Sequence, residues 1–187
     1  MTREDDTVWL ERSWQTILLE FSDLGDVEAI TRIVLRLLVA VLLGGLLGYE
    51  RETVGASAGL RTHMLVSLGS ALFVLIPLQA GMSIGDVSRV LQGVTAGIGF
   101  IGAGAILKHS SDNDIKGVTT AASVWLTAAI GIAAGMGREA TAVLSALFAL
   151  AILGLLRLTP KEPVIINLSD PKQPSSRLAV ETTEKAE

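Results

Sequence analysis

Cysteine is absent from the 187 residues, and aromatic residues make up only 4% of them. The lack of cysteine excludes disulfides, thiol catalysis and cysteine-ligated metal sites. The lack of aromatic residues is unusual for a soluble core, because half of the residues are hydrophobic, mostly Leu, Ala, Val and Ile. The net charge is only −4 and no basic cluster is present, so nothing supports nucleic-acid binding. Long apolar runs, which are typical of a membrane protein, carry the hydrophobic residues.

Five apolar segments follow one another along the chain. They cover residues 30–48, 62–80, 90–107, 118–136 and 140–158. Each is close to the ~20 residues that a helix needs to cross the hydrocarbon core. Short polar breaks separate them, notably Asp112–Asp114 and Met136–Glu139. The sequence therefore predicts an all-α, polytopic membrane protein with five transmembrane helices.

The N-terminal region predicts a different kind of helix. Residues 7–21 place Leu10, Trp14, Ile17, Leu18 and Phe21 at helical spacing, with charged residues largely elsewhere. This amphipathic segment is too short and too charged to span, and its tryptophans suit a membrane interface. The alternative is a helix packed on the rest of the protein. No basic stretch precedes an apolar run here, so we expect no cleavable signal peptide.

These patterns divide the chain into three parts. Residues 1–28 form an interfacial segment, 29–158 a membrane domain, and 159–187 a proline-containing polar tail that we expect to be largely disordered. Only 164–168 in the tail favours a strand. Lys and Arg outside the segments are more numerous on the side that holds the C-terminus. The positive-inside rule then places the N-terminus outside and the C-terminus in the cytoplasm.

Glycine is concentrated in three of the segments. The candidate packing positions are Gly44, Gly48, Gly93, Gly97, Gly99, Gly102, Gly104, Gly131 and Gly135. Pairs four residues apart lie on one helix face and allow close approach of backbones. The alternative is a thin wall beside a cavity, or a flexible helix. Residues 97–102 also match a dinucleotide-binding pattern as text, but they lie inside an apolar segment and lack the later acidic residue.

Charged residues gather at the two ends of the segments, where burial is costly enough to suggest function. The candidates are Arg36, Glu50, Arg51, Glu52, Arg61, His63, Asp86 and Arg89. We expect Arg36 and Asp86 to lie on one membrane face, within reach of a salt bridge or of one bridging water. Asp86 has an alternative role as part of a helix cap with Ser83. At the other end, Glu50 and Glu52 are candidates to pair with Arg61, and His63 is either a pH sensor or a satisfied interface residue.

The segments contain little that would conduct or ligate a cation. Mg²⁺ prefers octahedral oxygen coordination, yet no Asp or Glu occurs inside the second to fifth segments. This argues against a cation carrier, although direct Mg²⁺ binding stays open. No nucleophile–base pair or metal triad is visible, so we expect neither an enzyme nor a cofactor.

Three stretches taken together resemble a known family. They are RLLVAVLLGGLLGYERE (36–52), GLRTHMLVSLG (59–69), and DVSR (86–89) followed by GIGFIGAG (97–104) and KGVTTAASVW (116–125). Their order and spacing are similar to the N-terminal membrane domain of the MgtC/SapB family, over about residues 30–157. The eight charged candidates match the charged motif of that family.

The resemblance implies a bacterial inner-membrane protein linked to adaptation to low magnesium and, in pathogens, to survival inside host cells. It also implies the F-type ATP synthase as a candidate partner. The apolar segments and glycine faces add membrane lipid and a homo-oligomer as further candidate partners. The chain looks like a short form that lacks the cytoplasmic regulatory domain of larger members. We therefore expect regulation of membrane partners, with transport of Mg²⁺ or another small solute as the alternative.

Overall fold

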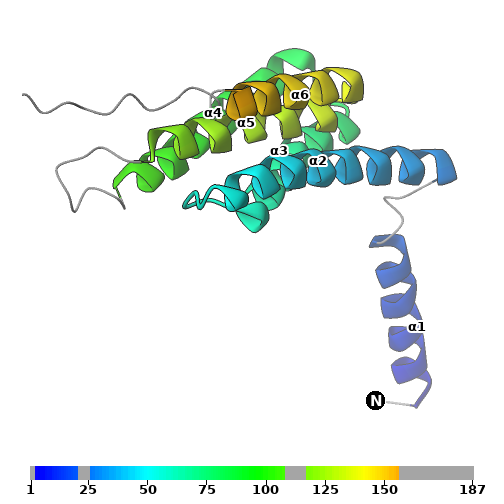
Figure 1. The fold of residues 1–187 in the computed structure, drawn as a ribbon. Coiled ribbons are helices and arrows are strands. Elements are labelled where there is room, and N and C mark those ends of the chain that lie inside the picture. The colour runs from blue at the N-terminus through cyan, green and yellow to red at the C-terminus, as the bar shows by residue number, and fades with distance from the viewer. Residues whose placement is uncertain (1–2, 21–25, 108–116, 156–187) are drawn as a thin grey trace, which may run out of the picture.

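The computed structural model describes residues 3–20, 26–107 and 117–155. Within these ranges all regular secondary structure is helical, which confirms the all-α prediction (Figure 1). The helices are α1 (Arg3–Glu20), α2 (Val27–Thr53), α3 (Leu60–Gln79), α4 (Ile84–Leu107), α5 (Val118–Gly135) and α6 (Glu139–Leu155).

Helices α2 to α5 are each long and apolar enough to cross a membrane. Helix α6 is also apolar but has 17 residues, and the described part of the chain ends with it. The protein is thus a polytopic membrane protein, with four of the five expected spans meeting the length requirement within the described residues. Helix α2 is longer than predicted because its ends extend into polar sequence, where Asp26 caps it by accepting the N–H of Ala29 at 2.5 Å.

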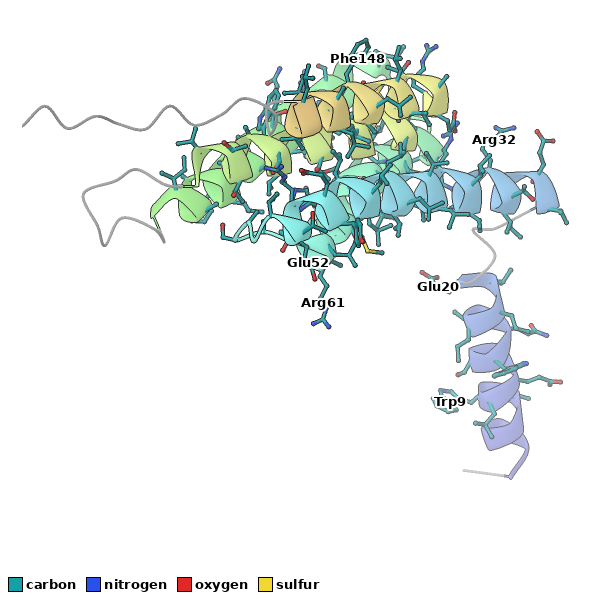
Figure 2. The ribbon with its side chains drawn as sticks, in the orientation of Figure 1. Trp9, Glu20, Arg32, Glu52, Arg61 and Phe148 are labelled. Carbon is teal, nitrogen blue, oxygen red and sulfur yellow. The ribbon has the colours of Figure 1, made fainter. Side chains whose placement is uncertain are left out.

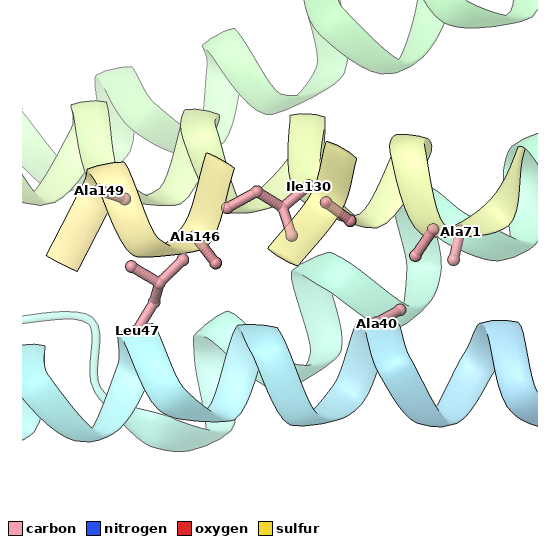
Figure 3. Close-up of a cluster of buried hydrophobic side chains, with 8 residues drawn as sticks. Ala40, Leu47, Ala71, Ile130, Ala146 and Ala149 are labelled. Carbon is pink, nitrogen blue, oxygen red and sulfur yellow. The ribbon is translucent and has the colours of Figure 1, made fainter. Parts of the chain in front are cut away.

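Helices α2, α3 and α5 form the centre of the bundle, and all three pack against one another. Helix α6 lies against α2 and α5, whereas α4 packs mainly on α5 and only slightly on α3. The core is built mostly from alanine; Figure 3 shows Leu47 of α2 directed toward Ala146 and Ala149 of α6. Large apolar side chains such as Phe73 and Phe100 lie on the outside, as expected where lipid rather than water surrounds the protein.

Glycines on α2 and α5 allow the close approach to α3. A methyl group added to Gly44 would lie 2.7 Å from the carbonyl oxygen of His63, and one added to Gly135 would lie 2.5 Å from that of Ala71. Gly48 and Gly131 meet the α3 backbone in the same way. These four positions confirm the packing prediction, since no other residue leaves room for two backbones at this distance.

Most glycines of α4 do not pack against another helix within the described part of the chain. A methyl group added to Gly93, Gly97, Gly99 or Gly104 would meet nothing within 4 Å among the described residues, and Gly102 makes only an ordinary contact with Ala121 at 3.5 Å. Helix α4 packs mainly on α5, so its face toward α3, which carries Gly93 and Gly97, stays open. A groove of about 690 Å³ lies there, and Gly93 and Gly97 line it. The alternative interpretation, a thin wall beside a cavity, describes these two positions correctly.

Helix α1 lies apart from the bundle (Figure 1). It begins at Arg3, four residues before the predicted start, and packs against no other helix of the described chain. Within residues 26–107 and 117–155, the structure therefore gives no support to the alternative in which this helix packs on the rest of the protein. Figure 1 shows α1 running across the direction of the bundle helices, at the end where α2 begins.

The predicted break at Met136–Glu139 is confirmed. Gly137 has a φ of +74°, and its N–H donates to Ala134 while that of Arg138 donates to Ala133, both at 2.9 Å. The predicted break at Asp112–Asp114, the strand at 164–168 and the tail 159–187 lie outside the described residues.

The glycine contacts give a stability prediction. We expect Gly131→Ala to lower the free energy of unfolding by about 2 kcal/mol, because the new methyl group overpacks the α3 backbone. Gly99→Ala is the matched control on an open surface, and we expect its effect to stay within about 0.5 kcal/mol. Unfolding of the purified protein in mixed detergent micelles measures both. Equal stability of the two variants would contradict the role of Gly131.

Candidate functional site

The predicted charged residues lie at the two ends of the bundle. We call the end where α2 begins the Arg36 end, and the end where α3 and α5 begin the His63 end. Helices α2, α4 and α6 run from the first to the second, and α3 and α5 run back (Figure 1). The structure brings together Arg36 with residues of the α5–α6 turn, and His63 with residues of α5.

At the Arg36 end, one guanidinium joins α2 to the turn between α5 and α6. Nη1 of Arg36 donates to the carbonyl oxygen of Gly135 at 3.3 Å, and Nε lies 3.8 Å from Oε1 of Glu139. A cation beside the last carbonyls of α5 is favourable, since a helix C-terminus carries partial negative charge. Only 21% of the Arg36 side chain is exposed. A methyl group at Gly137 would collide with the guanidinium, so this turn leaves room for it.

Arg36 and Asp86 lie at the same end of the bundle, as predicted, but they form no direct salt bridge. Asp86 instead accepts a hydrogen bond from Oγ of Ser83 at 2.7 Å, and its own N–H donates to the same oxygen at 3.2 Å. Arg89 lies 3.8 Å away in an exposed pair. Helices α2 and α4 do not pack against each other, so Arg36 finds a partner on α6 and Asp86 one within α4. Asp86 thus takes the alternative role, as part of a helix cap.

At the His63 end, α2 finishes in a bidentate ion pair between neighbouring residues. Nε and Nη2 of Arg51 donate to the two carboxylate oxygens of Glu50 at 2.5 and 2.7 Å, and Arg51 is 7% exposed. The ion pair offsets the desolvation cost of burying this guanidinium. Arg51 is buried and Glu50 is partly exposed, and the two side chains neutralise each other.

Glu52 caps the next helix rather than pairing with Arg61. Its Oε2 accepts the N–H of Leu60 at 2.8 Å, where Gly59 offers no side chain for the cap. Figure 2 shows Arg61 extending away from the bundle, and within the described residues it forms no ion pair. The predicted pairing is wrong because the free N–H groups of the first turn of α3 are the nearer partners for Glu52.

His63 is fully buried and links α3 to α5. Its Nδ1 lies 2.9 Å from the carbonyl oxygen of Gly59, which can only accept, so Nδ1 carries a hydrogen. Its Nε2 lies 3.2 Å from Oγ of Ser123, and that oxygen lies 2.8 Å from the carbonyl oxygen of Thr120. Of the two interpretations from sequence, the satisfied residue fits the hydrogen bonds, although its place is the bundle core rather than the interface.

The single hydroxyl hydrogen of Ser123 cannot serve both neighbours. If His63 is neutral, Ser123 donates to Nε2 and leaves Thr120. If His63 carries both hydrogens, Nε2 donates to Ser123, which then donates to Thr120. Either arrangement satisfies both ring nitrogens and keeps α3 tied to α5. The cluster thus accommodates a change of protonation by rotation of one hydroxyl group.

The contacts of these clusters join neighbouring helices or cap their ends. Nε of Arg36 is buried without a hydrogen bond, 3.8 Å from Glu139. Among the residues that the structure describes, no three His, Asp or Glu side chains are grouped to hold a metal ion. Sequence reasoning missed Ser123, Glu139 and Gly137 as partners. No local pattern marks these pairings, since the partners lie 60 or more residues apart in the chain.

The collision at Gly137 predicts a specific loss of stability. Gly81 has nearly the same φ (+73° against +74°) but nothing within 4 Å, so it serves as the matched control. We expect each change to alanine to cost about 1 kcal/mol in backbone strain, and Gly137→Ala to cost about 1 kcal/mol more by displacing Arg36. The extra loss should vanish in an Arg36→Leu background. Its persistence there would show that the guanidinium is not its cause.

Removal of the Ser123 hydroxyl should destabilise the bundle. Ser123→Ala leaves Nε2 of buried His63 without a partner, and we expect a loss of about 1–2 kcal/mol in the free energy of unfolding. Ser88, whose hydroxyl is exposed and bonds to Gly85 of its own helix, is the control; Ser88→Ala should change stability by less than about 0.5 kcal/mol. No difference between these variants would remove the hydrogen bond from the account of stability.

Comparison with known proteins places this membrane domain in a family. The chain is 44% identical to SrpB of Synechococcus elongatus over 129 residues, which is 63% of this chain and 71% of SrpB. It is 40% identical over 128 residues to YhiD of Escherichia coli K12, covering 64% of this chain and 58% of YhiD. Identity to MgtC of Brucella abortus is 42% over 120 residues, covering 63% of this chain and 48% of that protein.

The matched region thus spans between about half and seven tenths of these relatives. No solved structure matches the chain. Residues 37–161, about two thirds of the chain, match the family model described as the MgtC family. This region begins beside Arg36 and includes the whole of α3 to α6. The chain therefore belongs to the MgtC family.

Proposed function

We propose that the chain is a regulatory protein of the bacterial inner membrane that supports adaptation to low magnesium by binding a membrane-protein partner. Family membership supports the membrane setting, and one relative, YhiD of Escherichia coli, is named as a candidate magnesium transporter. The F-type ATP synthase is the partner that the family resemblance implies. The proposed orientation has the N-terminus outside and the C-terminus in the cytoplasm.

The observation that carries this proposal is the open groove between α3 and α4. It has a volume of about 690 Å³, and its walls are apolar apart from Ser70. Gly93 and Gly97 lie on the α4 wall with nothing within 4 Å of an added methyl group. Helices associate in lipid by close packing at small residues, so these two glycines offer a partner helix a near approach to the α4 backbone.

The centre of the bundle favours binding over transport. Ala40, Ala71 and Ala134 are fully buried where α2, α3 and α5 meet, and the buried His63 is bonded at both ring nitrogens. A Mg²⁺ pathway needs oxygen ligands along its length, whereas α3 and α5 contain no Asp or Glu. Transport of Mg²⁺ or another small solute is nevertheless the second candidate, because of the name of YhiD.

A matched pair of substitutions on α4 tests the partner-binding function. Gly97→Leu places a side chain in the groove, while Gly99→Leu places the same side chain on α4 outside it. We expect a deletion strain that expresses Gly97→Leu to fail to grow at limiting Mg²⁺. We also expect the amount of F-type ATP synthase recovered with the tagged variant to fall by about tenfold or more. Gly99→Leu should preserve both.

Equal membrane levels of the two variants are the control for folding. If Gly97→Leu retains growth and partner recovery, the groove is not the binding surface and the proposal fails. Purified protein in liposomes loaded with a Mg²⁺-sensitive dye separates the two functions. Uptake above that of empty liposomes, lost in Gly97→Leu and kept in Gly99→Leu, would instead favour the transporter.

A further inference from the structure

We propose that α1 is a membrane-surface anchor whose apolar face, made of Leu10, Trp14, Ile17 and Leu18, lies in the interfacial layer of the bilayer. This inference goes beyond the proposed function and does not rest on it. Helix α1 also lies outside the region that matches the MgtC family model, which begins at residue 37.

The apolar side chains of α1 have no protein partner within the described chain. Leu10, Trp14 and Leu18 are 60%, 61% and 55% exposed, and α1 packs on no other helix. A group of exposed large apolar side chains marks a binding surface for a protein or a membrane.

Helical geometry gathers these side chains on one side. At about 100° per residue, Leu10, Trp14, Ile17 and Leu18 fall within a sector of about 100°. The exposed Val8, Trp9 and Leu19 lie outside this sector, so the four side chains form the largest but not the sole apolar surface of α1. Thr16 lies on the opposite side of the helix, and Trp9 lies about 140° from Trp14. The two tryptophans of one helix thus report on two different faces, and only Trp14 belongs to the apolar face.

The position of α1 selects the membrane as the partner. The bundle helices must run across the bilayer, and α1 runs across their direction, which is along the membrane surface (Figure 1). Six Cα–Cα steps connect Glu20 to Asp26, so these residues can be no more than about 21 Å apart. Helix α1 is therefore held beside a bilayer at all times, and weak interfacial affinity is enough to seat it.

The charges of α1 indicate how it binds. Charged side chains at Glu11, Arg12 and Glu20 prevent it from spanning, and tryptophan is favoured at the level of the headgroups. Acidic residues outnumber basic ones in Arg3–Glu20, so attraction to anionic lipid does not drive the contact. Burial of the apolar face does, which predicts insertion into zwitterionic bilayers with little dependence on salt.

Single-tryptophan variants of the full chain test this proposal in phosphatidylcholine nanodiscs. The sequence has three tryptophans, so Trp125→Phe combined with Trp9→Phe leaves only Trp14, and Trp125→Phe combined with Trp14→Phe leaves only Trp9. We expect brominated lipids to quench Trp14 at least about twofold more than Trp9, and aqueous iodide to do the reverse. The fluorescence emission maximum of Trp14 should also lie at a shorter wavelength than that of Trp9.

A second matched pair protects the test against an effect of misfolding. Leu10→Glu adds a charge on the apolar face and Thr16→Glu adds the same charge opposite it, both at exposed positions. Leu10→Glu should remove the lipid quenching of Trp14, and Thr16→Glu should preserve it. Quenching of both tryptophans by iodide alone would place α1 in water, and protection of Trp14 from both quenchers would place it on protein. Either result overturns the proposal.

Discussion

The close approach of α2 and α5 to the backbone of α3 is the contact on which the rest of the structure depends. Helices in lipid gain little from the hydrophobic effect, so packing at short distance must supply their association. Gly44 and Gly48 on α2, and Gly131 and Gly135 on α5, allow this distance because each would collide with α3 if it carried a side chain. Alanine at core positions such as Ala40 allows the helices of the interior to approach closely as well.

Close packing of helices at small residues limits where polar residues can lie. A bundle of alanine and glycine has no room for unpaired charge, so Arg36 and Arg51 lie at its ends with specific partners. His63 lies within it, yet both of its ring nitrogens are bonded across the α3–α5 contact. The two polar clusters therefore fasten the ends of the same helices that the glycines hold together along their length.

Helix α4 departs from this pattern, and that departure is the basis of the proposed function. It carries more glycine than any one of α2, α3 and α5. However, Gly93 and Gly97 face a groove instead of a neighbouring backbone. In a membrane such a surface is covered either by lipid or by another helix. A partner helix gains packing contacts at the small residues that lipid chains cannot match, which supports a binding role for this face.

The sequence alone determined the all-α membrane fold, the position of each apolar helix, the turn at Gly137 and the family. These features depend on residues that are close together in the chain, namely the length and hydropathy of each segment and the glycine of the turn. It also identified Arg36, Glu50, Arg51 and His63 as candidates, since charge beside a bilayer is costly. It did not determine their partners. Arg36 meets Glu139 rather than Asp86, and Glu52 caps Leu60 rather than pairing with Arg61. Only the tertiary structure decides which helices touch, and so which glycines pack and which stay open.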